Sequence, residues 1–301
     1  MAIFRLNNPF IMSVQIFPNI REIAARYDGI VLDLWGVVHD GRDPYPGAID
    51  CLANLSRAGK RVILLSNAPR RSTTIIEQML TMNIGRDLYD DALSSGELAY
   101  RAITGRTDRF HAELGRRCLH IGPDRDRGLL VDMGLDRVDD VAGADFILNT
   151  GPWEDDETVA DYEARLAAAA ARNLPMVCAN PDIEVIRAGK RIICAGALAK
   201  RYEQLGAPVA YHGKPYPEAY RGAMEMMGIP DRRRVVAIGD SLLTDIKGGV
   251  AAGLDAILVT SGIHGAELGV KFGEHAAPDA VERAGQREGA VPFGVVPALQ
   301  W

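Results

Sequence analysis

Short apolar runs alternate with amphipathic stretches along most of this chain, and this alternation constrains the fold more than any other feature. The clearest runs cover residues 30–34, 62–66, 175–179, 235–238 and 256–259. A buried strand of a parallel sheet is apolar on both faces, and a helix usually connects it to the next parallel strand. The pattern therefore predicts an α/β fold in which helices cover a parallel sheet.

The length of 301 residues favours two domains. After Gly85 the alternation begins again with a second set of strands and helices, which resembles an α/β unit of its own. We predict an inserted α/β cap domain over residues 94–208. The Rossmann-like core domain would then consist of residues 1–93 and 209–301, and its sheet would resume at residues 209–211.

Composition excludes several classes of protein. Hydrophobic residues make up 48% of the chain and charged residues 25%, which is typical of a folded globular protein. The net charge of −6 disfavours a broad surface for nucleic acid or an anionic membrane. No apolar segment reaches the ~20 residues that span a bilayer, and residues 1–20 lack the pattern of an export signal. The four scattered cysteines are expected to be buried free thiols, so we expect a cytoplasmic enzyme.

Carboxylates stand where two of the predicted strands end. Asp33 ends the first apolar run, and Asp240 follows the run at residues 235–238, with Asp245 five residues further on. Open α/β sheets place their ligands at the carboxyl ends of their strands. Taken singly, each residue also has a purely structural interpretation. Asp33 could be an exposed turn residue, and Asp240 and Asp245 could cap a helix and lie in its first turn.

A hydroxyl, backbone amides and a lysine follow two other predicted strands. The run that begins at residue 62 leads into Ser66 and Asn67 at the start of a helix, which is a suitable cradle for phosphate. Lys214 follows the predicted strand at residues 209–211 and precedes another helix. On its own, Ser66 is equally a helix N-cap and Lys214 equally a solvated side chain.

The order Asp, Ser, Lys and Asp-x-x-x-x-Asp at strand ends resembles the four motifs of the haloacid dehalogenase-like superfamily. The resemblance is closest to class IIA, which carries a cap between the second and third motifs and contains p-nitrophenyl, phosphoglycolate and pyridoxal phosphate phosphatases. Further likeness comes from Ser-Ser-Gly-Glu at residues 94–97, Ala-Asn-Pro-Asp at 179–182 and Gly-Lys-Pro at 213–215. The match covers about residues 27–262, and the rest of the chain gives no functional signal.

The resemblance implies a hydrolase that acts on a small phosphorylated metabolite through an aspartyl-phosphate on Asp33. It also implies a Mg²⁺ ion, which shields the nucleophile from the negative charge of the substrate. The ion would bind the Asp33 side chain, the Trp35 backbone carbonyl and Asp240. Asp245 would be a water-mediated or more distant partner of the same ion.

The same resemblance assigns roles in phosphate and substrate binding. Ser66 and the Asn67 amide would hold phosphate oxygens, and Lys214 would neutralise the nucleophile and the transferring group. The cap would close over the site and select the substrate, with Asn180 and Asp182 as candidates. Asn-Pro-Asp is equally typical of a simple turn.

One position departs from the family pattern. Phosphatases of this superfamily carry a second aspartate two residues after the nucleophile, as general acid and base, and here that position is Trp35. Indole has no titratable proton near neutral pH. General acid/base catalysis contributes ~10²–10⁴-fold, so we expect weak activity on alkyl phosphates. His39 and Asp40 are possible substitutes, and a polar turn leading to Gly41 is the competing interpretation.

Two other interpretations remain open from the sequence. One is a catalytically weakened protein of the same fold that binds a phosphorylated metabolite as a sensor. The other is a receiver-like phosphoacceptor, since receiver domains also combine Asp, Ser or Thr, and Lys at sheet ends, although they lack so long an insertion. We expect no nucleic-acid or membrane partner, and a monomer or a homodimer.

Overall fold

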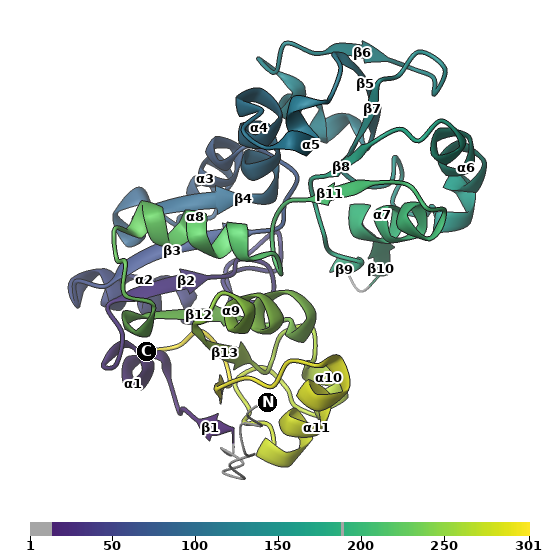
Figure 1. Ribbon diagram of the computed structural model, residues 1–301. Helices are drawn as coiled ribbons and strands as arrows, with labels where there is room; N and C mark the ends of the chain where they lie inside the picture. The colour runs from purple at the N-terminus through teal and green to yellow at the C-terminus, as the bar shows by residue number, and fades with distance from the viewer. Residues whose placement is uncertain (1–13, 188–189) are drawn as a thin grey trace, which may run out of the picture.

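The structure is a computed structural model, which describes residues 14–187 and 190–301. Two parallel sheets form two α/β units, the larger at the lower left of Figure 1 and the smaller at the upper right. The predicted α/β class is therefore confirmed, with a parallel core sheet and a second α/β unit inserted in the chain. Residues 1–13 lie outside the described part, so the expected lack of an export signal there stays a prediction.

The larger sheet has seven parallel strands in the order β1-β14-β13-β12-β2-β3-β4. They are β1 (Gln15–Ile16), β2 (Gly29–Leu32), β3 (Arg61–Ser66), β4 (Asp91–Ser94), β12 (Val235–Gly239), β13 (Asp255–Val259) and β14 (Gly294–Val296). Leu32 at the end of β2 lies opposite Leu64 on one neighbour and Ile238 on the other. The residues that follow β2, β3 and β12 therefore meet at one edge of the sheet.

Helices cover both faces of the larger sheet because its strands are apolar on both sides. Ile30 and Leu32 of β2 pack into the cluster with α1 (Ile20–Ala24), α2 (Ala48–Arg57) and α3 (Ser72–Thr81). Val31 faces the opposite cluster, on the side of α8 (Pro217–Met227), α9 (Lys247–Ala251) and α11 (Pro278–Glu288). The connections also contain η1 (Arg86–Leu88), η4 (Arg232–Arg234), η5 (Leu242–Ile246) and α10 (Gly265–Leu268).

The smaller sheet is also parallel, with the order β11-β8-β7-β5-β6. Its strands are β5 (Arg117–Ile121), β6 (Asp136–Val138), β7 (Phe146–Asn149), β8 (Met176–Cys178) and β11 (Val209–Tyr211). One face carries α6 (Glu163–Ala171) and α7 (Ala195–Gln204), and the other carries α4 (Ser95–Gly105) and η2 (Asp124–Leu130). The unit also contains α5 (Arg109–Ala112), η3 (Val159–Tyr162) and the hairpin of β9 (Glu184–Arg187) and β10 (Lys190–Ile193).

The expectation that the core sheet resumes at residues 209–211 is wrong. β11 pairs with β8 of the smaller sheet, with Val209 opposite Met176, and the larger sheet resumes only at β12. The reason is physical: β11 is a three-residue edge strand whose residues are half-buried. An apolar run this short carries no information about which sheet it joins.

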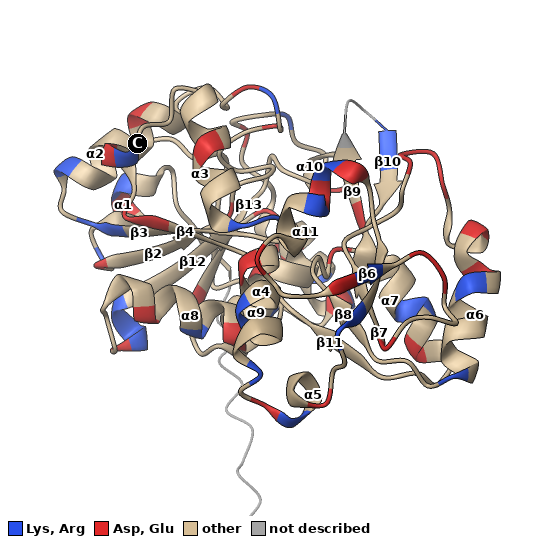
Figure 2. Ribbon diagram, turned by 90° about the horizontal axis from the view of Figure 1, so that it is seen from above, with Lys and Arg blue, Asp and Glu red and all other residues tan. Residues whose placement is uncertain are grey.

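Other expectations about the surface and the thiols can be compared with the structure. Figure 2 shows Lys and Arg positions interspersed with Asp and Glu positions over both units. Within residues 14–187 and 190–301, no helix combines the length and apolar character needed to cross a membrane. All four cysteines are buried and free, as expected, and burial raises the pKa of the Cys51 thiol to about 12.

Candidate active site

Three buried carboxylates meet at the carboxyl edge of the larger sheet. Asp33 follows β2, Asp240 follows β12, and Asp245 lies in η5, the helical turn that comes next. One oxygen of each lies within 4.8 Å of the others, and none of the three residues is more than 7% exposed. The sheet thus brings together side chains that are about two hundred residues apart in the sequence.

Lys214 joins this cluster from the connection between the two units. Its Nζ donates hydrogen bonds to Oδ1 of Asp33 and to Oδ1 of Asp245, the latter at 2.7 Å. The residue is only 3% exposed. The lysine therefore reaches the predicted edge, although the strand that precedes it, β11, belongs to the smaller sheet.

Asn67 links the cluster to the smaller unit. Its Oδ1 accepts from the Lys214 backbone N–H at 2.7 Å, and its Nδ2 donates to the Lys214 carbonyl at 3.0 Å. The same Nδ2 donates to Oδ1 of Asp182 at 2.8 Å. Asn180 accepts from the Asp182 amide at 3.0 Å, so Asn-Pro-Asp forms a turn and also reaches the site. Ser66 precedes Asn67 in the chain, and its Oγ accepts a hydrogen bond from the backbone N–H of Ala68 at 3.2 Å.

Two glycines permit this close packing of side chains and backbone. Gly36 has φ +83°, and a Cβ there would lie 2.0 Å from Oδ2 of Asp240. Gly213 has φ +116°, and a Cβ there would lie 2.5 Å from Oδ1 of Asn67. Both positions combine a backbone conformation that favours glycine with no room for a side chain.

The electrostatics of the cluster call for a cation. Burial and the neighbouring Asp245 raise the pKa of Asp33 well above its usual value, and they raise the pKa of Asp240 to about 7. Burial acts to lower the pKa of Lys214, but Asp245 and Asp33 outweigh it and raise that pKa. One ammonium thus faces three carboxylates. An all-oxygen donor set with excess negative charge is what Mg²⁺ requires, so the residues present fit that ion.

In the loop after Asp33, the Trp35 side chain packs against other residues of the same loop, His39 and Gly41. The indole packs edge-on to the His39 ring, with centroids 5.8 Å apart, and a Cβ at Gly41 would lie 2.0 Å from the indole. His39 Nδ1 accepts from the Gly41 amide at 2.9 Å, and burial lowers the His39 pKa to about 4. Asp40 accepts from two backbone amides further along the loop. This geometry matches the polar turn rather than a substitute acid.

Comparisons with known proteins identify the family. A sequence model described as a haloacid dehalogenase-like hydrolase matches residues 30–136, and one described as HAD-hydrolase-like matches residues 211–283. A crystal structure of a haloacid dehalogenase-like family hydrolase from Brucella suis 1330 is 33% identical, covers 93% of this chain and 98% of its own, and superposes with a TM-score of 0.76. The chain belongs to the haloacid dehalogenase-like hydrolase family.

Other similar proteins place this haloacid dehalogenase-like chain among the class IIA phosphatases. Ribonucleotide monophosphatase NagD from Escherichia coli K12 is 26% identical, over 78% of this chain and 88% of its own length. A glycerol phosphate phosphatase from Mycobacterium tuberculosis in complex with magnesium is 24% identical, covers 80% of this chain and 70% of its own, and has a TM-score of 0.61, which shows the fold alone. The chain is a phosphatase-type hydrolase, and the receiver-like interpretation is wrong.

The sequence did not single out one contact that positions a carboxylate. The backbone N–H of Ile263 donates to Oδ2 of Asp240 at 2.7 Å. Gly262 makes this approach possible, because a Cβ there would lie 2.2 Å from the Asp240 Cβ. A glycine just after the strand β13 is the only signal of this contact in the sequence, and glycines of that kind are common.

Proposed function

We propose that this haloacid dehalogenase-like hydrolase uses Mg²⁺ to remove phosphate from a small phosphorylated metabolite, with Asp33 as the nucleophile. The observation that carries the proposal is the contact of the buried Lys214 ammonium with Asp33 and Asp245 inside a cluster of three carboxylates. Such a cluster is costly to bury unless a cation offsets its excess negative charge.

The residues divide the chemistry among them. An Asp33 oxygen attacks phosphorus, and the bond from phosphorus to the leaving oxygen breaks with its electron pair. Lys214 neutralises the attacking carboxylate, while the Ser66 hydroxyl and the Asn67 amide donate to phosphoryl oxygens. Water then cleaves the aspartyl-phosphate, which releases inorganic phosphate and restores Asp33.

When bound, Mg²⁺ would supply electrostatic shielding between the nucleophile and the phosphoryl oxygens. Asp33, Asp240 and the Trp35 carbonyl would hold it, with Asp245 as a water-mediated or more distant partner. The magnesium complex of the glycerol phosphate phosphatase with the same fold supports this choice of ion.

Trp35 sets the range of substrates in this proposal. An alkyl phosphate expels an alkoxide that needs a proton, whereas an acyl or p-nitrophenyl phosphate expels an oxygen that is stable without one. Because indole supplies no proton, the enzyme should be weak on alkyl phosphates. Asp182, which accepts from Asn67, and Asn180 two residues before it would contact the leaving group.

The test is a panel of phosphate esters assayed with purified protein in Mg²⁺ and in EDTA. It should contain acyl phosphates, p-nitrophenyl phosphate, ribonucleoside monophosphates and glycerol phosphate. We expect turnover that requires Mg²⁺ and that is fastest for the activated esters. If the protein binds Mg²⁺ and a phosphate ester but hydrolyses no ester of the panel, the sensor interpretation replaces this proposal.

A further inference from the structure

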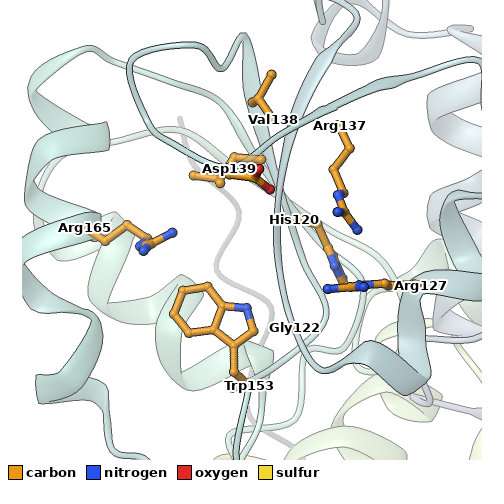
Figure 3. A pocket seen from close by; sticks show the side chains of 9 residues that line it. His120, Gly122, Arg127, Arg137, Val138, Asp139, Trp153 and Arg165 are labelled. Atoms are coloured by element: carbon orange, nitrogen blue, oxygen red, sulfur yellow. The ribbon is translucent and has the colours of Figure 1, made fainter.

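The smaller sheet has a pocket at its own carboxyl edge. The cavity measures about 110 Å³ and lies where β5 ends, next to the segment that follows β7. Figure 3 shows side chains converging on it from several elements. The lining residues on which the argument depends are Arg127, Arg137, Arg165, His120, Trp153 and Asp139.

The pocket carries an excess of positive charge. Three guanidinium groups line it, against one carboxylate, that of Asp139. Among the residues that the structure describes, no ion pair to a carboxylate is found for Arg137 or for Arg165, whereas Arg127 pairs with the exposed Asp124 at 2.6 Å. In Figure 3 Arg165 enters from the side opposite Arg127 and Arg137. An anion between them would be reached from two sides.

One wall of the pocket holds Arg165 in place, whereas Arg127 and Arg137 are exposed. The Arg165 guanidinium lies over the Trp153 ring, 4.6 Å from its centroid, and the same indole stacks on Tyr162 with centroids 4.9 Å apart. The backbone N–H of Trp153 donates to the Tyr162 hydroxyl at 2.7 Å. Ordering an arginine side chain in advance lowers the entropic cost of binding a ligand.

His120 contributes a neutral polar wall rather than charge. Its Nε2 lies 2.9 Å from Oγ1 of Thr150, and the residue is 8% exposed. Burial, followed by the nearby Arg127 and Arg137, lowers the His120 pKa to about 4. The positive charge of the pocket therefore comes from its guanidinium groups.

The pocket is separate from the catalytic cluster. The segments that reach the catalytic cluster follow β8 and β11, which lie at one side of the smaller sheet. The pocket lies around β5 and β6 at the other side, and β5 is two strands away from β8. Since neighbouring strands are ~4.8 Å apart, the pocket is displaced by roughly 10 Å or more along the same edge.

We propose that this pocket binds the phosphoryl group of a small ligand other than the substrate under attack at Asp33. Guanidinium groups bind phosphate oxygens in pairs of parallel hydrogen bonds, which makes arginine the residue suited to this anion. The volume admits a phosphoryl group with few further atoms, so a larger ligand would extend out of the pocket. Binding here needs no metal, unlike the chemistry proposed for the carboxylate cluster.

Calorimetric titration of the full chain with inorganic phosphate in EDTA tests the proposal. The pocket variant is Arg137→Gln with Arg165→Gln. The control variant, Arg109→Gln with Arg283→Gln, removes the same charge from exposed arginines that pair with neighbouring carboxylates. We expect the dissociation constant to rise at least tenfold in the pocket variant and less than twofold in the control, with circular dichroism confirming that both are folded.

Three results would overturn the proposal. The first is that the parent chain fails to bind phosphate in EDTA. The second is that the control variant weakens binding as much as the pocket variant, which would indicate a general effect of net charge. Alternatively, the pocket variant binds as tightly as the parent, which would place the phosphate elsewhere. The titration measures binding and not turnover, so its result can be interpreted even if the proposed hydrolase activity is absent.

Discussion

The two units of this molecule share a parallel α/β architecture, but the carboxyl edges of their sheets carry side chains of opposite charge. At the carboxyl edge of the larger sheet, three carboxylates and a lysine are almost completely buried. At the carboxyl edge of the smaller sheet, three guanidinium groups line a pocket; Arg127 and Arg137 are exposed and Arg165 is partly buried. The parallel sheet thus fixes where a ligand binds, whereas the side chains that follow its strands decide which ligand it is.

The difference in burial has a physical consequence. Buried carboxylates that outnumber their cations repel one another in a medium of low dielectric constant, so the larger edge depends on an added cation. Half-exposed guanidinium groups are hydrated by water, so the smaller edge is stable without a ligand. The first site should therefore respond to metal and the second should not.

The largest expected effect is the loss of turnover when the nucleophile of the larger unit is removed. Asp33→Asn should reduce kcat by at least ~10³-fold even at saturating Mg²⁺, because an amide is not a competent nucleophile. Asp279→Asn, a matched change of an exposed aspartate in α11, should leave turnover unaltered. Steady-state assays on p-nitrophenyl phosphate measure both, and turnover that survives in Asp33→Asn would place the nucleophile elsewhere.

The second effect concerns the proton that Trp35 does not supply. Trp35→Asp should raise kcat/KM on alkyl phosphates by about 10²-fold and change it little on activated esters. The measurement is kcat/KM for parent and variant across leaving groups of different pKa, with circular dichroism as a control for folding.

Equal efficiency of the parent enzyme on alkyl and aryl phosphates would contradict this reasoning and point to another acid. His39 and Asp40 are tied into their turn, so Asp182 would be the first residue to replace. Burial raises the pKa of Asp182, which favours its protonated form.

A smaller effect distinguishes the two edges by their need for metal. Asp245→Asn should raise the Mg²⁺ concentration for half-maximal activity by ~10–100-fold, as is typical when a group that supports metal ligands is lost. The pocket variant of the smaller unit should show the Mg²⁺ dependence of the parent. Metal titration of activity measures both, and a shift of equal size in the two proteins would show that the sites are not independent.

The smallest effect compares the stability of the two units. His120 has a folded pKa of about 4 against 6.5 when unfolded, so the unfolded chain binds more protons between these values. Its contribution to the free energy of unfolding is highest above pH 6.5 and is lost as the pH falls toward 4.

The parent-minus-variant difference for His120→Gln should accordingly fall by about 1–2 kcal/mol over that window. Urea unfolding at each pH measures this difference, which cancels the opposite effect of the carboxylates whose pKa is raised. His39→Gln is the matched change in the larger unit, because the His39 pKa is lowered to the same value. A difference that does not vary with pH would show that His120 is hydrated.

Much of the larger sheet was predictable because each central strand is a continuous apolar run. The runs at residues 30–34 and 235–238 correspond to β2 and β12 within two residues, and Asp33 and Asp240 lie at their ends as expected. The convergence of these carboxylates with Lys214 also agrees with the prediction.

The parts that sequence could not give depend on long-range pairing. The membership of β11 in the smaller sheet is decided by its contact with Met176, and nothing in the three residues themselves signals that choice. The pocket draws Arg127, Arg137 and Arg165 from three separate elements with no common spacing. Solvated charges occur throughout the chain, so only the folded structure distinguishes these three from the rest.

The two places where the chain passes between the units lie side by side. The Ser95 hydroxyl donates to the His212 carbonyl, and a Cβ at Gly213 would lie 2.6 Å from Oγ of Ser95. The smaller unit is therefore attached like a loop on a stem, and it interrupts the chain without interrupting the larger sheet. Because both connections meet at one point, Lys214 and every strand of the larger sheet lie outside residues 96–211, and the length of the inserted segment does not set the spacing of those strands.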